Sequence, residues 1–76
     1  MRDRILEQLK KINEEIVEDT NRNLLESGIL DSFSTVKVVV AMEDAFGVEI
    51  DIELVTPDNF RTAESIIRLM EDLLAQ

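Results

Sequence analysis

Apolar residues follow a helical period over the first part of the chain. They recur every three or four residues, with charged residues between them: Ile5, Leu9, Ile12 and Ile16. Such spacing places all of them on one side of a helix. We therefore predict a first helix over Asp3–Val17, followed by a loop from Asp19 to Leu30 that contains Thr, Asn, Ser and Gly.

A second helix is predicted after this loop. Asp31 and Ser32 are favourable residues for a helix N-terminus, and the segment Phe33–Phe46 contains neither Gly nor Pro before Gly47. Its three consecutive valines favour a strand locally, but its length is that of a helix. The positions predicted to face the core are Thr35, Val38, Val39, Met42, Ala45 and Phe46.

The rest of the chain predicts short elements and a last helix. Val48–Val55 alternates apolar and acidic residues but has no partner strand, so we expect an extended loop with a short helix near Ile52–Val55. Pro57 is expected to open a single helical turn that ends at Phe60, a core residue, and Thr62 to cap the last helix. The buried face of that helix is predicted to comprise Ile66, Ile67, Met70, Leu73 and Leu74.

The predicted fold class is therefore all-α. We expect one small domain over residues 1–76, a bundle of three main helices plus one short helix, with a long first loop. The longest uninterrupted apolar run, Val38–Met42, is far shorter than a membrane span needs, and the N-terminus lacks the apolar segment of a signal peptide. We expect a monomer that stays in the cytoplasm without membrane insertion.

Charge and composition exclude several classes of function. Seventeen Asp and Glu residues against eight Lys and Arg residues give a net charge of −9, which disfavours nucleic acid and anionic membranes as partners. The chain has no Cys and no His, so it lacks a disulfide, a thiolate metal site, a cysteine nucleophile and the usual catalytic base. We expect neither an enzyme nor a metal site.

The second helix carries a further apolar stripe, away from its core face. Phe33, Val36 and Val40 line up at i, i+3 and i+7, and we call these three residues the docking patch. The charged residues flanking it are Lys37, Glu43 and Asp44. From periodicity alone, the stripe is equally well explained by scattered surface residues or by a surface that binds a partner.

Ser32 stands at the edge of the docking patch, where the second helix begins. The unpaired N–H groups and partial positive charge of a helix N-terminus favour a phosphate attached there. From these neighbouring residues alone, a serine that only caps the helix is the better explanation, because an Asp-Ser pair at the start of a helix is ordinary. Ser34 is a poorer attachment candidate because it points closer to the core face.

The wider pattern resembles the acyl carrier protein family. The resemblance runs from Ile5 to Leu74 and rests on Gly28-x-Leu30-Asp31-Ser32-Phe33-x-x-Val36, on Phe46 at the end of the helix, and on Asn59-Phe60-x-Thr62. It implies that Ser32 carries a phosphopantetheine arm, derived from coenzyme A, in phosphodiester linkage. Such a carrier would hold an acyl or aminoacyl group as a thioester on the thiol of the arm.

The resemblance also implies partners. Asp31 would contribute negative charge for the phosphopantetheinyl transferase that installs the arm. The docking patch matches the family's partner-contacting face, and Glu43 and Asp44 match its acidic border. The implied partners are a loading ligase and the acyltransferases or synthases of fatty acid, polyketide or aminoacyl biosynthesis, each with a basic docking surface.

Two residues depart from the pattern of fatty-acid carriers. Phe33 replaces the Leu that often follows the modified Ser, and Lys37 stands where an acidic residue is usual. The run Asp-Ser-Phe-x-Thr-Val is similar to the D-alanyl carrier proteins and to free-standing carriers that serve adenylating ligases. We expect a dedicated carrier with few partner enzymes. The alternative is a helical adaptor that binds a partner through the docking patch, with Ser32 as a mere cap.

Overall fold

The computed structural model describes all residues, 1–76, and every element of its regular secondary structure is a helix. The three long helices are α1 (Arg2–Ile12), α3 (Ser32–Phe46) and α5 (Ala63–Leu74). The short elements are α2 (Glu15–Glu18), the 3-10 turn η1 (Ile52–Leu54) and α4 (Pro57–Phe60). The all-α class, the second helix and the Pro57–Phe60 turn are confirmed. No helix has both the length and the apolar character needed to cross a membrane.

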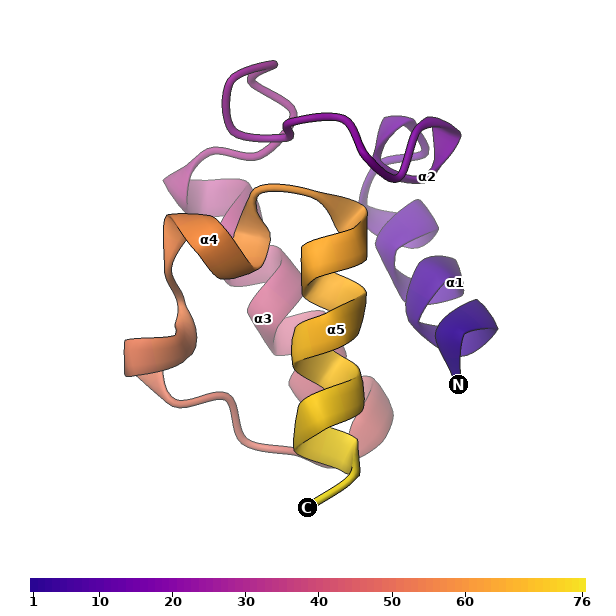
Figure 1. Ribbon diagram of the computed structural model, residues 1–76, viewed down its shortest axis with the longest axis vertical. Coiled ribbons are helices and arrows are strands. Elements are labelled where there is room, and N and C mark those ends of the chain that lie inside the picture. Colours follow the sequence, from indigo (N-terminus) through magenta and orange to yellow (C-terminus); the bar gives the residue numbers. More distant parts are fainter.

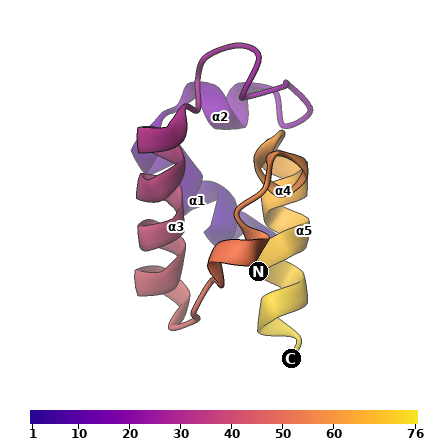
Figure 2. The ribbon, with the colours of Figure 1, turned by 90° about the vertical axis from the view of Figure 1, so that its left-hand side faces the viewer.

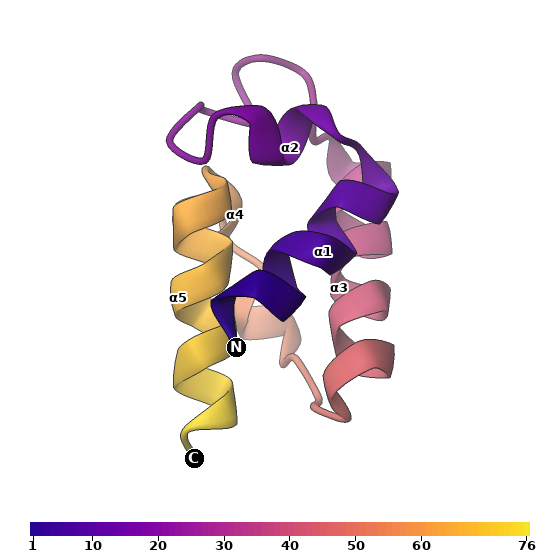
Figure 3. The same ribbon diagram turned by 90° about the vertical axis from the view of Figure 1, so that its right-hand side faces the viewer.

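Helices α3 and α5 run in the same direction (Figure 1) and lie on opposite sides of the bundle (Figure 2). Helix α1 crosses them on one side of the pair and packs against both (Figure 3). The turn η1 lies on the opposite side, between α3 and α5 (Figure 2). The loop between α2 and α3 closes the end of the bundle at which α3 and α5 begin.

The core consists of fourteen buried side chains, all of them apolar. They are Ile5, Leu9, Ile16, Leu24, Leu30, Val38, Met42, Ile50, Phe60, Ala63, Ile66, Ile67, Leu69 and Met70. No side-chain nitrogen or oxygen atom is buried without a hydrogen-bond partner. Because the interior holds no polar or charged residue, any chemistry of this protein takes place at its surface.

The predicted first helix, Asp3–Val17, is wrong in one respect, because the helix is interrupted at Asn13 and Glu14. Asn13 adopts an extended backbone, and its side-chain oxygen accepts the N–H of Glu15 at 2.9 Å. Asn side chains compete in this way with the backbone bonds of a helix. Ile16 is still fully buried, so the apolar period holds across the break.

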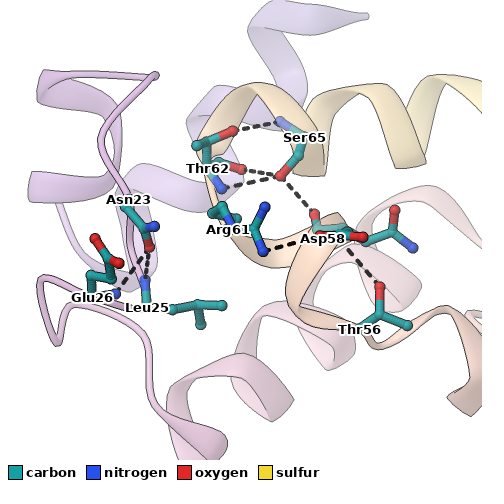
Figure 4. Close-up of polar contacts among 9 residues, drawn as sticks. Asn23, Leu25, Glu26, Thr56, Asp58, Arg61, Thr62 and Ser65 are labelled. Carbon is teal, nitrogen blue, oxygen red and sulfur yellow. Dashed lines mark hydrogen bonds and ion pairs between the residues drawn. The ribbon is translucent and has the colours of Figure 1, made fainter.

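The long loop before α3 is tied to the α4–α5 junction. The N–H of Leu24 donates to the carbonyl of Arg61 at 2.6 Å, and the N–H of Glu64 donates to the carbonyl of Thr20 at 3.1 Å. Asn23 shapes the turn between these bonds, since its side-chain oxygen accepts the N–H groups of two following residues (Figure 4). The loop that leads to Asp31 and Ser32 is therefore held in place by several hydrogen bonds.

The start of α5 is capped reciprocally, as Figure 4 shows. Thr62 accepts the N–H of Ser65 at 3.0 Å, and the Ser65 hydroxyl accepts the N–H of Thr62 at 3.1 Å. The same hydroxyl donates to the carbonyl of Asn59 at 2.9 Å, which joins α4 to α5. This confirms Thr62 as the cap of the last helix.

Candidate functional site

Ser32 is the first residue of α3, and its side chain is exposed. Asp31, in extended backbone just before it, serves as the N-cap. Its carboxylate oxygen Oδ1 accepts the N–H of Ser34 at 2.8 Å and the Ser34 hydroxyl at 3.0 Å. The capping role that Ser32 could have had thus belongs to Asp31, and the Ser32 side chain is exposed.

Both the side-chain carboxylate and the backbone carbonyl of Asp31 accept hydrogen bonds. Its carbonyl accepts the Thr35 hydroxyl at 2.7 Å and the Thr35 N–H at 2.9 Å. The hydrogen bonds from the Ser34 N–H and hydroxyl favour the ionised carboxylate, and they lower the pKa of Asp31 below its ordinary value. A fixed negative charge therefore precedes the exposed hydroxyl of Ser32.

The docking patch is exposed along α3. The exposed fraction is 70% for Phe33, 58% for Val36 and 49% for Val40. On the opposite face Val38 and Met42 are buried, which confirms the division of this helix into two apolar faces. The patch is therefore an exposed apolar surface near Ser32, of the kind that can bind a partner.

Lys37 lies on the same exposed face of α3, next to Phe33. Its ammonium nitrogen is 4.8 Å from the centre of the Phe33 ring, in cation–π geometry. It is the only cation between Arg22 and Arg61, a stretch that contains eight carboxylates, yet no carboxylate forms an ion pair with it. Lys37 thus places one unneutralised positive charge on the aromatic end of the docking patch.

The two predicted acidic border residues differ in their surroundings. Asp44 is exposed. Glu43 is half-buried, and its carboxylate accepts the N–H of Ile50 at 2.8 Å, which holds the loop that follows α3. The sequence pattern places both residues on the border, but only the structure reveals that Glu43 has this internal partner.

A pocket of about 680 Å³ opens beside Ser32. Ser32, Thr35 and Val36 of α3 form one wall, and Thr56 and Phe60 form part of the other. The preceding loop contributes Gly28, a turn residue with positive φ, where an added Cβ atom would meet no neighbour within 4 Å. The sequence identifies Gly28 only as part of a motif, and no pattern in it indicates the wall formed around Thr56.

These residues fit a phosphopantetheine group attached at Ser32. The hydroxyl is exposed at the first residue of a fifteen-residue helix, where N–H groups and the helix dipole favour a phosphate. The adjacent pocket, with apolar side chains among its lining residues, leaves open space for a slender arm. The structure contains no cluster of three or more carboxylates able to hold a metal ion.

Comparison with known proteins gives one consistent result. The family model of the phosphopantetheine attachment site matches residues 1–70. The chain is 34% identical over 74 residues to the D-alanyl carrier proteins of Listeria monocytogenes and Listeria welshimeri, and the match covers 95% of each chain. It is 31% identical over 71 residues to that of Bacillus velezensis, with 91% of each chain covered. The protein therefore belongs to the phosphopantetheine-binding carrier proteins, whose members carry a covalently attached phosphopantetheine group and are not enzymes.

Proposed function

We propose that Ser32 is the attachment residue and that the protein carries a D-alanyl group. The observation that carries the first part is the exposed Ser32 hydroxyl at the start of α3, next to a cap formed by another residue. The second part is supported by the D-alanyl carrier proteins to which nearly the whole chain is similar. It also agrees with Phe33 and Lys37, the two departures from the fatty-acid carrier pattern.

The attachment reaction uses one hydroxyl of this chain. The Ser32 oxygen forms a bond to the pantetheine-bearing phosphorus of coenzyme A, the diphosphate P–O bond breaks, and adenosine bisphosphate leaves. The hydroxyl proton passes to a base of the transferase, since this chain has no His and the hydrogen bonds from Ser34 lower the pKa of Asp31, which makes its carboxylate a weak base. Once attached, the arm supplies the thiol on which the carried group is held as a thioester.

The chain's own residues bring partner enzymes to Ser32. The net charge of −9 attracts basic surfaces over a distance, and the docking patch supplies apolar area for the final contact. The partners that we propose are the phosphopantetheinyl transferase and a ligase that adenylates D-alanine. Asp31, Lys37 and Asp44 are the charged side chains exposed to them on this face.

Mass spectrometry of the intact protein tests the attachment. The purified chain is incubated with coenzyme A, Mg²⁺ and a broad-specificity phosphopantetheinyl transferase. We expect the wild-type mass to rise by one phosphopantetheine and the mass of Ser32→Ala to stay unchanged. Ser65→Ala, at a serine that lines no part of the pocket beside Ser32, serves as the control and should still gain the group. An unmodified wild-type chain would favour the adaptor interpretation.

The carried group is tested separately. The protein is recovered from its own cells, and the thioester-bound group is released and identified with its stereochemistry. We expect D-alanine. A fatty acyl chain or an amino acid of the L configuration would contradict the D-alanyl proposal and would leave the attachment at Ser32 intact.

A further inference from the structure

The Ser34 hydroxyl forms a hydrogen bond to Asp31 that the attachment of the arm at Ser32 does not itself require. It is half-buried, and both of its hydrogen-bond donors, the N–H at 2.8 Å and the hydroxyl at 3.0 Å, point to the same oxygen of Asp31. The N–H bond alone is enough to cap the helix. The hydroxyl bond is an addition that further restricts the Asp31 side chain.

The additional bond restricts rotation of the Asp31 carboxylate, and both Ser34 bonds use Oδ1. An exposed Asp ordinarily samples several staggered rotamers. Here Oδ1 accepts two hydrogen bonds from Ser34, and the Asp31 carbonyl accepts one from the Thr35 hydroxyl. Oδ2 is therefore the carboxylate oxygen that remains free to bind a cation. A carboxylate oxygen of fixed direction, one residue before Ser32, suits a cation such as a basic side chain or a Mg²⁺ ion at the transferase site.

We propose that Ser34 is a positioning residue for the modification of Ser32. Its hydroxyl orients the Asp31 carboxylate so that Oδ2 meets a cation of the phosphopantetheinyl transferase. Ser34 itself does not touch the transferred group. This inference rests on the proposed attachment at Ser32.

The test measures the kinetics of arm attachment with coenzyme A, Mg²⁺ and a broad-specificity phosphopantetheinyl transferase. Ser34→Ala keeps the N–H that caps the helix and loses only the hydroxyl. We expect kcat/KM to fall about three- to tenfold, mainly through KM, as one hydrogen bond of ordinary net strength would produce. Ser34→Thr keeps a hydroxyl and should restore kcat/KM to within about twofold of the wild type.

A second pair of variants identifies the path of the effect. Asn caps a helix as well as Asp does, so Asp31→Asn should keep the melting temperature and lose the carboxylate. We expect Asp31→Asn to lower kcat/KM at least as much as Ser34→Ala, and the double variant to be no slower than Asp31→Asn alone. A further loss in the double variant would mean that Ser34 acts independently of Asp31, and would overturn the proposal.

Ser65→Ala is the matched control for loss of a capping hydroxyl elsewhere. Ser65 is half-buried at the start of α5 and lines no part of the pocket beside Ser32. We expect it to lower the melting temperature and to leave kcat/KM unchanged. Ser34→Ala within twofold of the wild type would refute the positioning role. A wild-type chain that acquires no arm, or a Ser32→Ala chain that acquires one, would instead refute the proposed attachment, and the positioning role with it.

Discussion

Two phenylalanines of this chain offer a matched test of the docking patch. Phe33 is 70% exposed at the start of α3, whereas Phe60 is 2% exposed at the end of α4. The same substitution, Phe→Ala, removes the same atoms at both positions. We predict that Phe33→Ala weakens the interaction with the transferase and leaves the fold stable, and that Phe60→Ala has its main effect on the fold.

The magnitudes follow from burial. Fully burying a Phe side chain is worth about 1.5–3 kcal/mol. Because Phe33 exposes 70% of its surface, about 1–2 kcal/mol remains to be gained against a partner, or about a five- to thirtyfold rise in KM on truncation. Loss of the contact with Lys37 changes the stability of the free protein by only about 0.5 kcal/mol. Phe60→Ala should cost about 3–5 kcal/mol, a large share of the stability of so small a domain.

The assay combines thermal unfolding, followed by circular dichroism, with the kinetics of arm attachment. A loss of about 0.5 kcal/mol should lower the melting temperature of Phe33→Ala by only a few degrees relative to the wild type. The melting temperature of Phe60→Ala should be about 12 °C or more below that of the wild type. If Phe33→Ala melts as early as Phe60→Ala, the ring belongs to the core. If its KM stays unchanged, the patch does not contact the transferase. Either result refutes the reasoning.

Three further predictions concern charge. The pKa of Glu64 is lowered from 4.5 to about 2, chiefly by hydrogen bonds from the Arg2 guanidinium at 2.8 and 2.6 Å. Its contribution to stability is therefore complete above pH 4.5 and lost as the pH falls toward 2. Glu64→Gln should lower the melting temperature at pH 7, and the difference from wild type should vanish near pH 2. A constant difference across that range would contradict the assignment. Lys37→Glu should lower the KM of the basic transferase about two- to fivefold at low salt, and a rise in KM would instead indicate that a partner carboxylate meets this ammonium. Finally, kcat/KM of arm attachment should fall as salt rises from 0.01 to 0.15 M, where the Debye length shrinks from about 30 to 8 Å. Rates insensitive to salt would exclude electrostatic steering.

The fold could be predicted largely because its core is wholly apolar. Where every buried residue is apolar, the period of the apolar positions indicates the buried face of a helix, but a second apolar stripe such as Phe33, Val36 and Val40 has the same period and is exposed. The same period does not report whether the backbone is continuous. Ile16 is buried as predicted, yet it belongs to a separate short helix, because the Asn13 side chain ends the hydrogen bonding of α1. A local side-chain bond of this kind leaves the apolar pattern unchanged.

The candidate site was predictable where it depends on neighbouring residues and less so where it depends on the fold. The exposure of Ser32 and of the docking patch followed from their positions on one helix. The spacing Asp31-x-x-Ser34 is readable as a capping pattern, although the hydroxyl bond to the same oxygen is not. The pocket wall at Thr56 and the bond from Ile50 to Glu43 join distant segments, and no period within one helix encodes them.

On helix α3, the residues that stabilise the fold and the residues proposed to contact partners lie only two positions apart. Val38 and Met42 are buried and hold the bundle together, whereas Val36 and Val40, two residues before each, face solvent. Because exposed substitutions usually change stability little, the docking patch can vary without endangering the fold. Phe33 and Lys37 lie on this tolerant face and contact each other. Under the proposed function, we expect substitutions at these two positions to change the affinity for partner enzymes and to leave the core and the start of α3 around Ser32 as they are.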